Sequence, residues 1–168
     1  MSVFIDRSVR KALTDHLLTI GTEIGFTEER VLDLSVFGDP AYTEADILLS
    51  EGEDAGELPQ DRDWLEYFLV KSPQRIFTPS GCGISRKAFQ FVIWVKTQRW
   101  KDTHYNEMVA GLIEDHFNNN QHFTLENGDI LTVLKTYQQA SIVKDSASGR
   151  LFNRVFVDCE NYFKNNNK

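Results

Sequence analysis

The segment Arg86–Lys96 (RKAFQFVIWVK) constrains the fold most, because apolar side chains occupy both sets of its alternating positions. Successive side chains of a strand point to opposite faces of a sheet. One face would carry Phe89, Phe91, Ile93 and Val95, and the other Ala88, Gln90, Val92 and Trp94. A strand that is apolar on both faces is typical of the centre of a sheet. We therefore expect a central strand here, covered on each side.

Two segments have the spacing of amphipathic helices. Between Val9 and Ile20 apolar residues recur every three or four positions, and Gly21 is the expected stop. The second apolar stripe runs from Tyr105 to Phe117, after Asp102 or Thr103 as the N-terminal cap, and a run of three asparagines ends it. Each helix would bury one face and leave the other in solvent.

Three further segments have strand patterns, namely Trp64–Lys71, Ile130–Val143 and Arg150–Phe163. The expected order is α-β-β-α-β-β, in which strands adjacent in sequence favour antiparallel pairing. Packing both helices on one face of the sheet buries every apolar stripe economically. The sequence thus predicts an α+β fold with a four-stranded, mainly antiparallel sheet and two helices on one face. Its 168 residues suit a single domain, 1–168, with a frayed tail at 164–168.

Residues 22–63 interrupt these patterns with charge. They contain 13 acidic and two basic residues, a net charge of −11, whereas the rest of the chain carries +4. An irregular segment of this length is unusual inside a compact domain unless it is functional or disordered. We expect either a solvated acidic loop after the first helix, or an arm that orders against a neighbouring subunit or a basic partner.

No motif for catalysis or for a bound group is present. The four histidines lack metal-ligand spacing, and no phosphate-binding or nucleophile motif occurs. Cys82 and Cys159 are expected to be free thiols in a reducing compartment. The overall charge of −7 argues against a general nucleic-acid binder. We therefore expect no catalytic residue, no cofactor and no metal, and we regard the chain as not an enzyme.

Targeting signals are also lacking. The first residues, MSVFIDRSVRKALTD, contain no apolar core of a signal peptide, and no stretch of the chain has the apolar length of a membrane span. We expect synthesis in the cytoplasm and no membrane partner.

Five segments together resemble a known family. They are RKALTDHLLTI, WLEYFLVK followed by GISRKAFQFVIWVK, the helix HYNEMVAGLIEDHF, and the closing strand RLFNRVFVDCENYF. In this order they resemble the tail terminator family of long-tailed bacteriophages, the minor tail protein U-like group. The resemblance covers most of residues 6–163 without the acidic segment, and it is one of architecture and patterning rather than of a single motif.

The resemblance implies a structural virion protein. It would form a homo-hexameric ring that caps the completed tail tube and offers an attachment platform to head-side neck or head-completion proteins. The ring would lie at the head-proximal end of the tail after assembly in the host cytoplasm. DNA would pass through it without specific recognition.

Interface candidates come from the charge split and from the loop Ser72–Gly83, because subunits joined head to tail need complementary surfaces. They are Glu51, Glu53, Asp54, Glu57, Arg75, Phe77, Arg86 and Lys87. Three alternatives stay open. They are a head-completion or neck adaptor, a small enzyme that uses Cys82 or an acidic pair, and a nucleic-acid-binding module that uses Arg99, Trp100 and Lys101.

Overall fold

The computed structural model describes residues 2–33, 63–71, 75–76, 84–98, 102–144 and 150–164. Two helices, α1 (Ser2–Glu23) and α3 (Thr103–His116), and a short 3₁₀ helix, η1 (Glu28–Arg30), accompany one sheet. The strands are β1 (Val31–Asp33), β2 (Trp64–Lys71), β3 (Arg75–Ile76), β4 (Ile84–Thr97), β5 (His122–Thr124), β6 (Ile130–Gln138), β7 (Val143–Lys144) and β8 (Leu151–Lys164).

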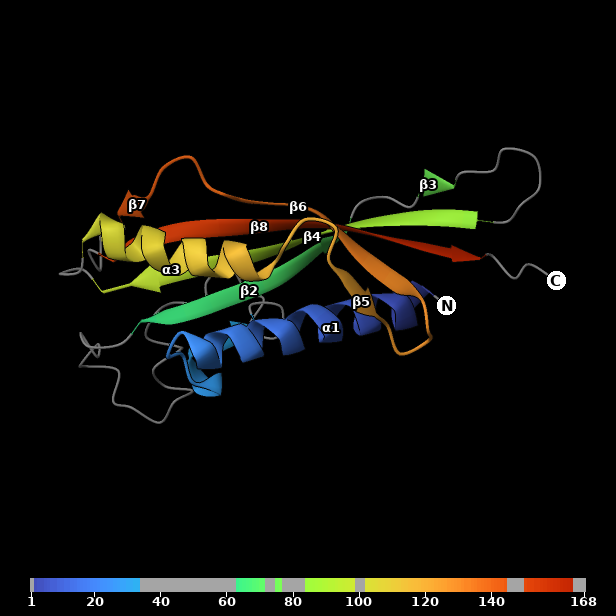
Figure 1. The fold of residues 1–168 in the computed structure, drawn as a ribbon, viewed down its shortest axis with the longest axis horizontal. Helices are drawn as coiled ribbons and strands as arrows, with labels where there is room; N and C mark the ends of the chain where they lie inside the picture. Colours follow the sequence, from blue (N-terminus) through green and yellow to red (C-terminus); the bar gives the residue numbers. More distant parts are fainter. Residues whose placement is uncertain are drawn as a thin grey trace.

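The sheet has the strand order β1-β2-β4-β8-β6-β5, with β3 beside β4 and β7 beside β8. Its pairs are antiparallel except for β1 with β2, which is parallel. The long strands β4 and β8 pair along their whole length and form the spine of the molecule (Figure 1). The central position expected for Arg86–Lys96 is therefore correct, since β4 lies between β2 and β8.

The α+β class with two helices and a mainly antiparallel sheet is confirmed, but the count of four strands is wrong. The described residues place six strands along the main order of the sheet. The additional strands β1 and β5 are three residues long, too short for an alternating pattern to be recognised. The expected strand Ile130–Val143 is also divided, because β6 ends at Gln138 and β7 begins at Val143.

The start of the acidic segment is more regular than expected. Helix α1 continues through Gly21 to Glu23, and η1 and β1 follow within residues 28–33. Gly21 does not end the helix; it allows close packing, since a Cβ at this position would lie 3.3 Å from a methyl group of Val31. The left-handed residue that follows the helix is Gly25, at φ +89°. Residues 34–62 lie outside the described part of the chain.

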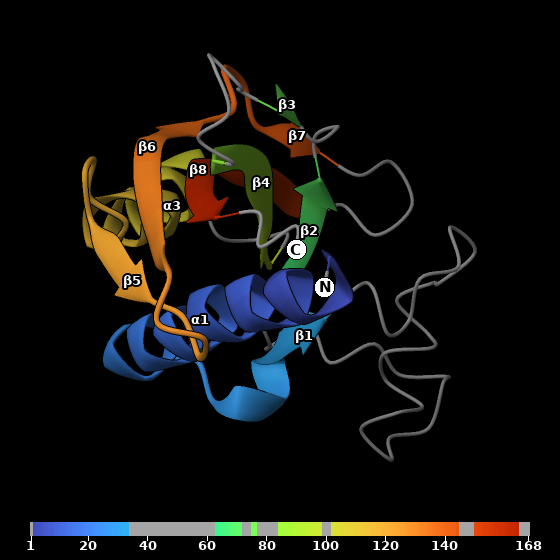
Figure 2. The same ribbon diagram turned by 90° about the vertical axis from the view of Figure 1, so that its right-hand side faces the viewer.

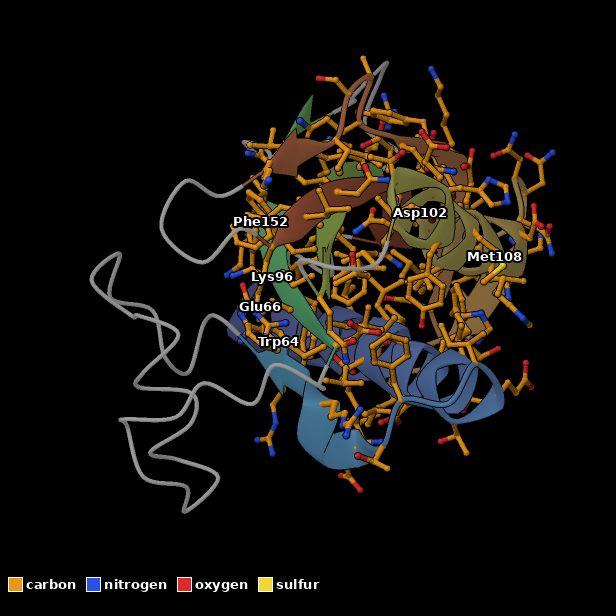
Figure 3. All side chains as sticks on the ribbon, turned by 90° about the vertical axis from the view of Figure 1, so that its left-hand side faces the viewer. Trp64, Glu66, Lys96, Asp102, Met108 and Phe152 are labelled. Carbon is orange, nitrogen blue, oxygen red and sulfur yellow. The ribbon has the colours of Figure 1, made fainter. Side chains whose placement is uncertain are left out.

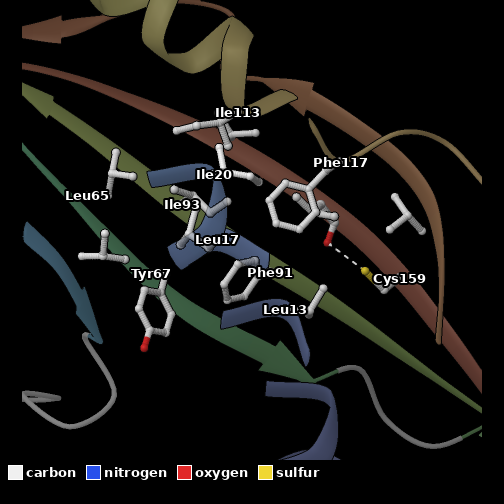
Figure 4. Close-up of a cluster of buried hydrophobic side chains, with 14 of the residues drawn as sticks. Leu13, Leu17, Ile20, Leu65, Tyr67, Phe91, Ile93, Ile113, Phe117 and Cys159 are labelled. Atoms are coloured by element: carbon white, nitrogen blue, oxygen red, sulfur yellow. Dashed lines mark hydrogen bonds between the residues drawn. The ribbon is translucent and has the colours of Figure 1, made fainter. Parts of the chain in front are cut away.

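Both helices pack on the same face of the sheet. Val9, Leu13, Leu17 and Ile20 of α1 are buried together with Ile113 and Phe117 at the end of α3. They meet the odd-numbered residues of β4 and β8, including Phe91, Ile93, Val157 and Cys159. Figure 4 shows this core between the helices and the strands. Burial of each large apolar side chain stabilises the fold by about 1.5–3 kcal/mol, so this face supplies most of the folding energy.

Helix α3 is held in place by polar groups as well. Asp102 caps it as expected, accepting a hydrogen bond from the Tyr105 amide at 2.8 Å. The fully buried Asn106 amide lies within hydrogen-bonding distance of the Val95 and Leu151 carbonyls and of Thr97 Oγ1. These contacts join the first turns of α3 to the ends of β4 and β8, and they set the helix direction across the sheet.

Candidate interface on the open face of the sheet

The face of the sheet opposite the helices is the open face. It is formed by the even-numbered residues of β4 and β8 and by their cross-strand partners. Register places these side chains in rows, such as Trp64–Lys96–Phe152 and Glu66–Trp94–Arg154. Figure 2 shows α1 and α3 within the curve of the sheet, and Figure 3 shows Trp64, Glu66, Lys96 and Phe152 on the side away from α3. The aromatic residues of this face are Trp64, Phe68, Trp94, Tyr137, Phe152, Phe156 and Tyr162.

The prediction that Arg86–Lys96 is covered is confirmed on the helix side, whereas on the open face the described residues place no helix over the strand. On the helix side Phe91, Ile93 and Val95 are fully buried. On the open face Val92 is buried, but Trp94 and Lys96 are half-buried, and no described helix lies over them. A large aromatic residue such as Trp94 reads as a core residue in a sequence, although here a cation stacks on its outer surface.

Lys96 is at the centre of the first cluster on the open face. Its ammonium group lies 2.6 Å from the carboxylate of Glu66, which also accepts a hydrogen bond from the Trp64 indole at 2.9 Å. The same ammonium group lies 4.7 Å from the ring centroid of Phe152 and 6.0 Å from those of Trp64 and Trp94. Because Glu66 is only 3% exposed, this is a desolvated ion pair in an aromatic surrounding.

Two arginines stack on the indole rings of this cluster. Arg154 lies over Trp94 at 3.9 Å, and the buried Arg150 lies over Trp64 at 4.2 Å. The Nε atom of Arg154 is buried and has no hydrogen-bond partner among the described residues. Stacking of this kind uses the face of a guanidinium group and not its N–H donors.

Further along the strands the open face continues with paired groups. Tyr137 stacks on Phe156 at 5.2 Å, and Lys135 lies over the Tyr137 ring at 4.9 Å. Gln90 donates hydrogen bonds to Asp158 and to the Tyr137 hydroxyl. At the far end Arg86 forms an ion pair with Glu160, beside Tyr162, which is 53% exposed. The open face is thus a continuous ladder of aromatic and charged side chains.

The structure describes only some of the residues that were expected at an interface. Glu51, Glu53, Asp54, Glu57 and Phe77 lie outside the described residues, and Arg75 is described only as a β3 residue whose partner in register is Arg86.

Arg86 and Lys87 point to opposite faces of the sheet. Arg86 lies on the open face, whereas Lys87 is buried on the helix side over the ring of Phe89. Consecutive strand residues alternate in direction, so these two side chains cannot form one patch.

The residues that dominate the open face were not singled out as a site from the sequence. Alternation in the last strand does group Phe152, Arg154 and Phe156. The pairing of Arg154 with Trp94, and of Lys96 with Glu66, depends on the register between strands far apart in the chain. The register between two strands cannot be predicted from the residue pattern within one strand.

The His16 imidazole and the Cys159 thiol lie on the helix side of the sheet. His16 donates from Nε2 to the main-chain oxygen of His116 at 2.8 Å and packs edge-on against Phe117. Burial raises the pKa of the Cys159 thiol to about 12, with the nearby Asp158 carboxylate adding to the shift, so the thiol is neutral at physiological pH. The described residues contain no group of three His, Cys, Asp or Glu side chains able to hold a metal. Cys82 lies outside them.

Comparisons with known proteins bear on the fold alone. No protein-family model matches the chain, and no curated protein is significantly similar to it. A solved structure of unclear function is similar, with a TM-score of 0.56 and 13% identity over 97% of this chain and 96% of the other. At this identity the likeness indicates a shared fold. Separately, neither described helix has the length and apolar character needed to cross a bilayer.

Proposed function

We propose that this chain is a tail terminator of a long-tailed phage, a structural virion protein whose copies form a ring on the completed tail tube. The observation that carries the proposal is the open face, because interfaces between proteins are enriched in Trp, Tyr, Phe and Arg. This face gathers those residue types on one side of the sheet. The two-helix α+β fold and the resemblance of the quoted segments support the same function.

A structural role agrees with how the charged groups of the open face are used. Glu66, Asp158 and Glu160 contact Lys96, Gln90 and Arg86 respectively. These contacts position side chains as a surface, and the neutral Cys159 thiol is not prepared as a nucleophile. We assign no catalytic residue, cofactor or metal, and the function is the binding of neighbours in a fixed geometry.

A ring at the end of a tail must also bind proteins other than its own copies. The outer side of α3 supports this, since Met108 and Leu112, one turn apart, are 48% and 38% exposed. Figure 3 shows Met108 on the far side of the molecule from Trp64 and Phe152. The tail tube protein and a neck or head-completion protein are the proposed partners, at the head-proximal end of the virion tail.

The first test is the mass of the purified protein by size-exclusion chromatography with light scattering. A ring predicts a species near six times the 19.3-kDa protomer, in solution or after addition of tail tube protein. A protein that stays monomeric under both conditions would contradict the proposal.

The second test separates a terminator from a neck adaptor, using electron microscopy of particles from a phage that lacks this gene. A terminator predicts overlong tails, because tube subunits continue to add. Tails of normal length beside unjoined heads would instead assign the adaptor role and overturn the terminator proposal.

A further inference from the structure

Two cations of the open face are not neutralised within the described part of the chain. Arg154 and Lys135 stack on Trp94 and Tyr137, and neither forms an ion pair with a described residue. On the same face Glu66 and Glu160 form ion pairs with Lys96 and Arg86. Asp158 accepts a hydrogen bond from Gln90 and is the partner of Lys135 in register, without an ion pair between them. The open face therefore retains positive charge beside its half-buried aromatic rings.

The chain itself carries the complementary charge. Residues 34–62 contain eight acidic residues and one arginine, a net charge of −7, which equals the net charge of the whole protein. The remaining residues are therefore neutral in sum. Interfaces commonly place a positive patch against a negative one, which selects the partner and sets the register.

We propose that the open face, centred on Trp94 and Arg154, is the docking surface for the acidic segment 34–62 of a second copy. This inference rests on the proposed function and names the contact that joins one ring subunit to the next. A head-to-tail contact between two different patches of identical subunits closes into a ring when the rotation permits. The docking segment is rich in carboxylates, and the open face offers the cations Arg154 and Lys135 in an aromatic surrounding. Guanidinium groups form strong, charge-assisted hydrogen bonds with carboxylates.

A carboxylate-bearing peptide fits this surface better than a nucleic acid does. Aromatic and basic residues on a sheet also bind single strands, but a phosphate backbone carries one negative charge per nucleotide. The open face presents Glu66, Asp158 and Glu160 between its cations, so it lacks the uninterrupted basic groove that follows a phosphate backbone. A short segment with separated carboxylates can avoid these groups and still meet Arg154 and Lys135.

Complementation between two full-length variants tests whether the contact forms between copies. One variant is Arg154→Gln, which removes the central cation of the docking surface. The other, called the neutralised-segment variant, combines Glu51→Gln, Glu53→Gln, Asp54→Asn and Glu57→Gln, which lowers the negative charge of the docking segment. We expect each variant to self-associate at least tenfold more weakly than the parent, and their mixture to form a one-to-one heterodimer by sedimentation velocity. Arg7→Gln on the exposed side of α1 is the matched control and should associate like the parent.

A mixture that stays monomeric would overturn the inference, because the segment would then dock within its own chain or elsewhere. Parent-like association of Arg154→Gln would overturn it as well. Either result leaves the terminator proposal standing if the mutant phage still makes overlong tails, so the two failures are distinguishable.

A second measurement does not depend on ring formation. A synthetic peptide of residues 44–61 is titrated into the neutralised-segment variant, which carries the four Gln and Asn substitutions, while tryptophan fluorescence is followed. We expect the affinity for the peptide to decrease as salt is added. We also expect it to be at least tenfold lower when Arg154→Gln is combined with that variant. Equal binding by both proteins, or binding of a single-stranded oligonucleotide in preference to the peptide, would contradict the proposal.

Discussion

The two faces of the strands β4 and β8 have the same backbone and opposite chemistry. On the helix side, Phe91, Ile93 and Val157 are fully buried among side chains from α1 and α3. On the open face, Trp94 and Phe152 are equally large but stay half-exposed, with Arg154 and Lys96 stacked on them. On the helix side, the apolar surface of the sheet is covered by the two helices. On the open face, it is covered in part by cationic side chains of the same chain.

Under the proposed function, the two faces meet different requirements. A face that serves folding is stabilised by closure around dry side chains. A face that serves assembly must remain soluble before its partner arrives, and long cationic side chains over aromatic rings provide that solubility. Substitutions on the helix side should therefore affect the stability of the monomer, and those on the outer part of the open face should affect association.

The largest effect on stability is expected from Phe91→Ala. Phe91 is fully buried and contacts the rings of Tyr67 and Phe117. Removing a ring of this kind leaves a cavity, and we expect a loss of about 3–5 kcal/mol in the free energy of unfolding. Urea denaturation followed by circular dichroism measures it. Met108→Ala, at an exposed position of α3, is the control and should change the value by less than about 0.5 kcal/mol.

The ion pair inside the open face should be the next most sensitive position. Glu66→Gln leaves the Lys96 ammonium group without its carboxylate in a largely desolvated place, which should cost about 3 kcal/mol. In the double variant Glu66→Gln/Lys96→Met no charge is left unpaired, so part of this loss should be recovered. Equal losses in the single and double variants would show that packing, and not charge, determines stability here.

Elements that follow from a local sequence pattern could be predicted, whereas contacts between segments far apart in the chain could not. The helix of residues 9–20 and the central strand 86–96 are strong local patterns, and both elements exist. The strand β1 has three residues and pairs with β2 across more than thirty positions, so no local pattern reveals it. The open face has the same origin: Trp94 and Arg154 are partners only because β4 and β8 pair in one register.

The buried thiol of the helix side gives a prediction for alkaline pH. The pKa of the Cys159 thiol is raised to about 12 in the folded protein from its ordinary value of 9.0, so above pH 9 the unfolded chain ionises first and the folded state loses stability. The loss should reach about 1 kcal/mol at pH 10. Comparing Cys159 with Cys159→Ala, both in a Cys82→Ser background, at pH 7 and pH 10 isolates this group. An identical pH dependence in the two proteins would rule out the raised pKa.

The cap of α3 tests a local contribution that is independent of either face. Asp102→Ala removes the acceptor of the Tyr105 amide and should lower the free energy of unfolding by about 1 kcal/mol. Asp102→Asn keeps an acceptor at the same place and should retain most of the stability, as measured by thermal unfolding. A similar loss in both variants would mean that the carboxylate charge, and not the hydrogen bond, is what matters at this helix end.

The smallest change in monomer stability is expected at Arg154, where the comparison of the two faces is tested most sharply. The half-buried Arg154 side chain contributes a cation–π contact with Trp94 worth about 0.5–1 kcal/mol. Arg154→Gln should therefore lower the free energy of unfolding, measured in urea at a concentration where the protein is monomeric, by less than about 1 kcal/mol. A loss as large as that of Phe91→Ala would place Arg154 among the folding residues. The open face would then resemble the helix side, and weaker association of this variant would follow from misfolding instead of from a lost contact between copies.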